Sequence, residues 1–230
     1  MAQTDLDICN RAIDRVSGDR IEAFGEDSPL GVFCTANWPI FRDWLLSKYR
    51  WSFASTVAQL LRDGEAEARA ARPYAYAYKP PADLVGAVHA WRDSARLDAS
   101  PRHVTVASMD GALWSDTTPL FAEYTARVVE ARWPGWMVRL ATTAFAADMA
   151  DFCQNRSLAR DLRMEAFGTP GEGGEGGLYR QAREEDARQA PPRQLVTGVD
   201  AGPLVGARQM GGFGRSFGSS APVTIIIGGE

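Results

Sequence analysis

The sequence predicts a mainly α protein: a helical bundle with a small antiparallel β excursion and an extended C-terminal arm that ends in a β-strand. Three observations predict this fold. Apolar residues recur at helical spacing in the first sixty or so residues and again after residue 134. Between these regions the pattern changes to alternation, which is typical of strands. Beyond residue 190 the chain is rich in glycine and proline and poor in core-forming residues.

The same changes predict the domain organisation. Residues 1–190 are expected to form one domain, with a helical body at 4–70 and 134–190 and a β insertion at 72–130. Residues 191–230 are expected to form a separate extended arm. The 230 residues are 45% hydrophobic and 23% charged, so the chain has enough apolar side chains for a packed core.

The first helix is predicted from its own boundary signals. Thr4 and Asp7 match a capping box, and Leu6, Cys9, Ile13 and Val16 follow on one stripe before Gly18. A helix from Thr4 to Val16 is therefore expected.

A second helix is predicted to begin at Pro29, because Pro is favoured in a first helical turn and Asp27 or Ser28 can cap it. It is expected to run to about Arg50, with a kink at Pro39. After a short break near Trp51, the helical period is expected to continue to residue 61.

An antiparallel sheet is predicted between residues 84 and 129. Asp110-Gly111 is a tight-hairpin signal between two alternating segments. Upstream, Tyr74, Tyr76 and Tyr78 alternate with alanines and would share one face of an extended segment. Two prolines at 80 and 81 then end any regular pairing.

Helices are expected again from Pro134 to about Phe167, with a break at Asn155. The segment Gly168–Gly177 holds six glycines, which predicts no regular structure. A last helix would end at Pro191-Pro192.

The residues with metal-binding or nucleophilic chemistry are few. Only two histidines and three scattered cysteines are present, so neither a metal site nor a cofactor is expected, and no catalytic residue is predicted. Asp148 and Asp151 share a helix face, which we interpret as a solvated acidic edge. The alternative is a small hydrolase or transferase that uses these two carboxylates.

Charge and hydropathy limit the partners. A net charge of −4 and an isoelectric point near 5.3 argue against a broad, nonspecific grip on nucleic acid, which needs a basic face. No apolar run is long enough to span a membrane, and the N-terminus lacks the pattern of a secretory signal, so synthesis in the cytoplasm is expected.

The C-terminal arm ends in an uncharged, β-prone segment. Unpaired in water, such a strand would be an aggregation hazard, so we expect it to add to the sheet of a partner. The alternative is that it pairs with this chain's own small sheet. The predicted partner-binding residues are Pro222, Val223, Thr224, Ile225, Ile226 and Ile227.

The order of several motifs resembles the head-to-tail adaptor family of tailed bacteriophages, also described as tail tubular protein A or head completion proteins. An "R-D-x-L-L…W-x-F-A" signature falls on Arg42, Asp43, Leu45, Leu46, Trp51, Phe53 and Ala54. A "Y-x-Y-x-L-P-x-D-x-L" signature falls on Tyr76, Tyr78, Pro81, Asp83 and Leu84, with proline instead of leucine at position 80. The resemblance covers roughly residues 5 to 190, but the glycine segment and the long arm depart from the family pattern.

The resemblance implies a non-enzymatic structural protein of the virion, placed in the neck after assembly in the host cytoplasm. Its protomers, twelve in the family, would form a ring between the portal protein and a downstream tail or stopper/nozzle protein. Genomic DNA would pass through the ring without sequence-specific binding. The alternative from another class is a transient assembly protein that leaves before maturation.

Overall fold

The computed structural model describes residues 4–68, 74–96 and 104–189. The chain divides into two units at Pro191 and Pro192, and all described residues belong to the first unit, Met1–Pro191. Within the described ranges, no helix combines the length and the apolar character that crossing a membrane requires. The predicted arm, 191–230, lies outside these ranges.

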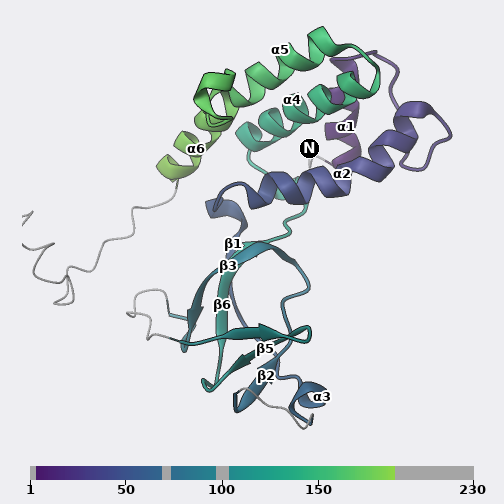
Figure 1. Ribbon diagram of the computed structural model, residues 1–230. Helices are drawn as coiled ribbons and strands as arrows, with labels where there is room; N and C mark the ends of the chain where they lie inside the picture. The colour runs from purple at the N-terminus through teal and green to yellow at the C-terminus, as the bar shows by residue number, and fades with distance from the viewer. Residues whose placement is uncertain (1–3, 69–73, 97–103, 190–230) are drawn as a thin grey trace, which may run out of the picture. The chain divides into compact units, whose positions relative to one another are not determined.

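Five helices pack together, with α4 in the middle in contact with each of the other four (Figure 1). Alanines on α4, among them Ala141, Ala144 and Ala147, are buried and let the neighbouring helices approach closely. The five helices are α1 (Asp5–Asp14), α2 (Pro29–Ser47), α4 (Gly135–Phe152), α5 (Arg156–Phe167) and α6 (Gly177–Gln189).

In the described part of the chain, six strands form two antiparallel three-stranded sheets, with the strand orders β1-β6-β3 and β2-β5-β4. The strands are β1 (Ser55–Gln59), β2 (Tyr76–Tyr78), β3 (Leu84–Arg92), β4 (Ala107–Met109), β5 (Ala112–Ser115) and β6 (Phe121–Ala126). The shorter elements are the one-turn helix α3 (Gly64–Glu67) and the 3-10 helices η1 (Ser52–Ala54), η2 (Glu130–Arg132) and η3 (Pro170–Glu172).

The prediction of a mainly α protein is wrong. Helices account for 48% and strands for 18% of the structure, and the two sheets make it a mixed α and β protein. The largest error lies in the segment after Arg50, where a continued helix was expected and β1 is found. Strand β1 pairs along its whole length with β6, from Ser55↔Thr125 to Gln59↔Phe121. This distant pairing outweighs the local apolar spacing, which resembles a helix only by coincidence.

Several local predictions are confirmed. Thr4 caps α1, and the Thr4–Asp7 capping box forms in both directions. Ser28 caps α2, and Asn155 separates α4 from α5. Asp110 and Gly111 both have positive φ, of 52° and 77°, and join β4 to β5 as a tight hairpin.

The glycine segment is more regular than predicted. Thr169 and Glu172 form a second capping box around η3. Gly177 begins α6 with a φ of 57°, and a Cβ at this position would lie 2.4 Å from the backbone oxygen of Glu165. The glycines therefore allow a close approach to the end of α5 that no other residue permits.

Three apolar clusters stabilise the described unit. The largest lies among the helices and contains an aromatic group of Trp38, Phe41, Trp133 and Phe145, whose contacting rings have centroids 5.0 to 6.2 Å apart. The second lies against the strands and is built from Leu60, Tyr78, Leu113, Leu120 and Tyr124 together with two alanines. The third and smallest contains Ala66, Ala77, Ala112 and Trp114.

Candidate interaction surface

The predicted partner-binding residues, 222–227, lie outside the described ranges. The residues of the two signature motifs all lie within the described ranges, and each has a defined place in the fold.

The first signature is built mainly into the helical core. Leu45, Leu46, Trp51 and Ala54 are buried, and the indole N–H of Trp51 donates to the carbonyl of Leu45 at 3.2 Å. Phe53 packs at the edge of the same core, 5.6 Å from the Trp136 ring. These residues shape the end of α2 and the turn into β1.

The second signature is built into the β core. Tyr78 is buried and its hydroxyl donates to the carbonyl of Thr117 at 2.7 Å, while Tyr76 and Leu84 pack around it. Pro81 accepts a hydrogen bond from the backbone N–H of Leu84 at 3.3 Å, which closes the turn before β3.

Arg127, which belongs to neither signature, connects the two. Its guanidinium donates to Asp43, with Nε–Oδ1 and Nη2–Oδ2 distances of 3.0 and 2.6 Å. Its backbone N–H donates to the carbonyl of Asp83 at 2.7 Å. The carboxylate of Asp83 in turn accepts a hydrogen bond from the Tyr124 hydroxyl at 2.8 Å. Burial together with this bond raises the pKa of Tyr124 to about 12.

Two further contacts extend this junction between helices and strands. Glu130 accepts hydrogen bonds from Arg42, at 3.4 Å, and from the indole of Trp38, at 3.2 Å. Nearby, the buried Glu123 on β6 forms ion pairs with Arg92, at 2.8 Å, and with Arg50. The charged signature residues Arg42, Asp43 and Asp83 are therefore structural. Arg127 and Glu130 could not be identified from the sequence, because neither belongs to a signature.

The two carboxylates of the hydrolase alternative are held in ion pairs. Arg163 of α5 lies 3.3 Å from Asp148 and also pairs with Asp151. Desolvation raises the pKa of Asp148 in spite of the pairing. Within the described residues, no group of three or more His, Cys, Asp or Glu side chains is placed to hold a metal ion. The arrangement joins α4 to α5.

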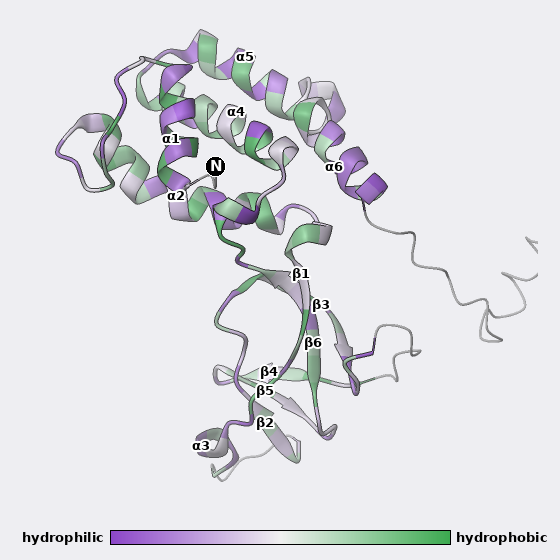
Figure 2. Ribbon diagram, turned by 180° about the vertical axis from the view of Figure 1, so that it is seen from behind, coloured by the Kyte–Doolittle hydropathy of each residue, from purple (hydrophilic) through white to green (hydrophobic). Residues whose placement is uncertain are grey.

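The outward side of α2 is unusually apolar. Most surface helices carry charges on their solvent face, but α2 has none from Pro29 to Phe41. Val32 and Ile40 are 57% and 71% exposed, and Trp44 one turn further on is 43% exposed. Figure 2 shows this part of α2 largely in pale and green shades, whereas α6 is mostly purple.

Neighbouring aromatics extend this apolar face. Phe33 lies 4.8 Å from the half-exposed Phe152 at the end of α4, measured between ring centroids. Trp44 lies 5.8 Å from Phe167 at the end of α5. We name the surface formed by Val32, Phe33, Ile40, Trp44 and Phe152 the α2 face. Because these side chains are already partly buried, covering one of them contributes less than the roughly 1.5–3 kcal/mol of a full burial, but together they make the α2 face suited to a protein partner.

A groove opens beside the C-terminal part of α2. It has a volume of about 810 Å³, and its walls come from α2, the end of α4, α5 and the glycine segment. We name it the basic groove, because its lining includes four cationic side chains and one carboxylate. These are Lys48, Arg156, Arg160, Arg163 and Asp151. Trp44, Met164, Phe167 and Pro170 supply apolar surface.

The α2 face could have been found in the sequence from the absence of charges between Pro29 and Phe41. The basic groove could not, because its residues come from segments more than a hundred positions apart. No protein-family model matches the chain, and no curated protein matches it in sequence.

Proposed function

We propose that this chain is a structural, non-enzymatic subunit of a phage neck, a head-to-tail connector that forms a ring between the portal and the tail and continues the DNA channel. The observation that carries the proposal is the α2 face. The exposed side of α2 is uncharged from Pro29 to Phe41 and combines Thr35 and Asn37 with the large apolar side chains of the α2 face, and an exposed apolar surface of this kind is typical of an interaction site. We expect another protein chain to cover the α2 face, because the α2 face lies on the surface of its own unit.

The resemblance to adaptor proteins supports the nature of that partner. In this chain both signatures contribute to one junction between helices and strands, through Asp43, Asp83 and Arg127. A subunit that transmits contacts between a portal and a tail needs such a connection between its two structural parts. The acidic net charge of −4 suits a channel through which DNA passes without being held.

The test combines the purified protein with the portal of the same particle and measures the mass of the complex. A ring of twelve copies adds about 300 kDa to the portal, given a chain mass of 25.1 kDa. Ile40→Glu is expected to weaken ring formation by about tenfold or more, because a charge would be buried at the interface. Its stability should change by less than about 0.5 kcal/mol, since the side chain is largely exposed.

Leu61→Glu is the matched control. Leu61 is 75% exposed but lies after β1, away from the α2 face. This variant should form rings normally. A wild-type protein that neither associates with portals nor remains in purified particles would contradict the connector function and favour a transient assembly protein.

A further inference from the structure

The two ends of α2 carry opposite charges. Before its N-terminus, the segment 19–28 holds four carboxylates and one arginine. The arginine, Arg20, is already paired with Asp14 of α1 at 2.7 Å. The remaining charge on this segment, which we name the acidic loop, is therefore strongly negative. Its carboxylates are Asp19, Glu22, Glu26 and Asp27.

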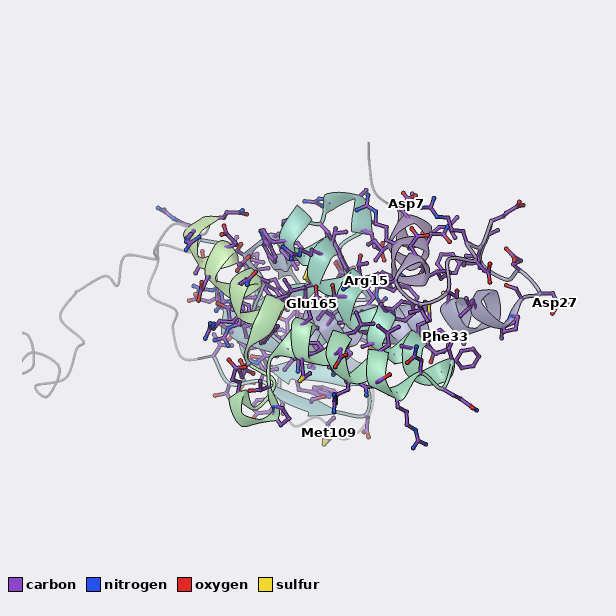
Figure 3. All side chains as sticks on the ribbon, turned by 90° about the horizontal axis from the view of Figure 1, so that it is seen from above. Asp7, Arg15, Asp27, Phe33, Met109 and Glu165 are labelled. Atoms are coloured by element: carbon purple, nitrogen blue, oxygen red, sulfur yellow. The ribbon has the colours of Figure 1, made fainter. Side chains whose placement is uncertain are left out.

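The acidic loop is a built structure. The side chain of Asn10 holds the backbone of Ile21 by two hydrogen bonds, each of 2.9 Å. The Asn10 Oδ1 accepts from the Ile21 N–H, and the Asn10 Nδ2 donates to the Ile21 carbonyl. Gly25, at a φ of 84°, donates its N–H to the Thr35 hydroxyl of α2 at 2.8 Å. Asp27 is exposed and projects away from the helices (Figure 3). A loop held in this way loses little conformational freedom on binding.

The basic groove lies towards the other end of α2, and part of its positive charge is not neutralised within the described residues. Arg163 is paired with two aspartates, as described above. Lys48 instead lies over the rings of Trp44 and Phe167, 4.8 and 5.4 Å from their centroids. The nearest carboxylate to Arg160 is that of Asp161, at 3.6 Å, and both side chains are highly exposed, so this pair contributes little.

We propose that the basic groove of one protomer receives the acidic loop of a second copy of this chain. The charges are complementary: the loop holds four carboxylates, and the groove is lined by Lys48, Arg156 and Arg160 in addition to the paired Arg163. The 19 residues of α2 separate the loop from Lys48 by about 28 Å, so the acidic loop cannot reach this end of the groove on its own protomer.

Such a contact joins two different surfaces, so each added copy presents a free loop at one side and a free groove at the other. Contacts of this kind close into a ring when the rotation between neighbours allows it. This contact would explain how neighbouring protomers join, and its role in a ring rests on the proposed function. The α2 face, which continues beside the groove through Trp44, would be partly covered by the same neighbour.

The test reverses the charges of each side and measures self-association by sedimentation velocity. Arg156→Glu with Arg160→Glu alters the groove, and Glu22→Lys with Asp27→Lys alters the loop without removing the Glu26 carboxylate that accepts a hydrogen bond from the Glu22 N–H. Either double variant alone should associate at least about tenfold more weakly than the wild type. An equimolar mixture of the two should recover association, and so should one chain that carries all four changes. Arg180→Glu with Arg188→Glu, on the exposed side of α6, is the matched control and should associate normally.

Three outcomes would overturn the inference: a wild-type protein that stays monomeric, association unaffected by either reversal, or two weakened variants that do not rescue each other. A nucleic acid is the other occupant of matching charge. If a fluorescent single-stranded oligonucleotide binds the wild type and loses affinity only with the groove variant, while self-association is unchanged, the groove serves nucleic acid instead.

Portal binding, measured in parallel, separates this inference from the proposed function. Charge-dependent self-association without portal binding would support the loop-in-groove contact and contradict the connector. Rings that form on the portal equally well with all four charge changes would support the connector function and contradict the loop-in-groove contact.

Discussion

Asp43 of α2 and Arg127, which follows β6, form a two-pronged ion pair, with the guanidinium nitrogens 3.0 and 2.6 Å from the two carboxylate oxygens. This geometry is the strongest that an arginine and a carboxylate can adopt. Because the Arg127 backbone also bonds to Asp83, one residue ties α2 to the start of β3 and the end of β6. The junction between helices and strands therefore depends on a small number of specific polar contacts.

Replacing Asp43 by asparagine should destabilise the protein. The amide keeps the shape of the side chain but loses the charge, so both Arg127 and Arg42 lose an ionic partner. We expect a loss of about 1 kcal/mol in the free energy of unfolding, because the pair is partly exposed and screened by solvent. Chemical denaturation measures it. Asp161→Asn, whose carboxylate is exposed and weakly paired, should lie within about 0.5 kcal/mol of the wild type. Equal stabilities for all three proteins would rule out a structural role for the Asp43 pair.

The same residue predicts a pH dependence. Burial alone would raise the pKa of Asp43, but the hydrogen bonds and charges of Arg127 and Arg42 outweigh it and lower the pKa below its ordinary value of 3.8. The unfolded chain therefore takes up this proton at a higher pH than the folded protein does. The stabilisation is fully present above about pH 5, where the unfolded chain has also lost this proton, and is lost as the pH falls through the folded pKa.

The direction of this pH dependence can be checked by measuring the melting temperatures of the wild type and Asp43→Asn across the acid range. The difference between the two proteins should be constant above about pH 5 and shrink towards zero in stronger acid. A difference that grows on acidification would show that the carboxylate is not stabilised by its arginines.

Gly177→Ala should disturb the wall of the basic groove. The substitution places a methyl group 2.4 Å from the backbone oxygen of Glu165 and puts a side chain at a φ of 57°. We expect a loss of more than about 1 kcal/mol, since neither backbone can move without breaking the contact between α5 and α6. Gly171→Ala is the control, because its new methyl group would meet nothing closer than 3.9 Å. If both variants unfold at the wild-type denaturant concentration, the close approach of Gly177 to α5 is not a real constraint.

Some structural features of this protein follow from local sequence patterns and others do not. The capping box of Thr4 and Asp7 and the hairpin at Asp110-Gly111 were predicted and found, because each depends on residues within a few positions of one another. Strand β1 was predicted as helix, because its conformation is decided by β6, some seventy positions away. The glycine segment was underestimated, since its order comes from contacts with α5.

The candidate sites follow the same division. The uncharged stretch of α2 is visible in the sequence, but which of its sides faces outward depends on how α2 packs against α4. The two signature motifs could be located from their spacing, whereas Arg127, which joins them, could not. Asp43 and Arg127 are 84 positions apart, and no local pattern relates them.

Local sequence patterns are thus sufficient for the helices with strong end signals, the tight hairpin, the uncharged run of α2 and the acidic segment before it, because backbone preferences and neighbouring side chains decide these features. The division of the strands into two sheets, the junction through Arg127 and the gathering of cationic side chains in the basic groove depend on the tertiary fold. Those features owe their stability and their placement to contacts between distant segments, and such contacts exist only once the chain has folded.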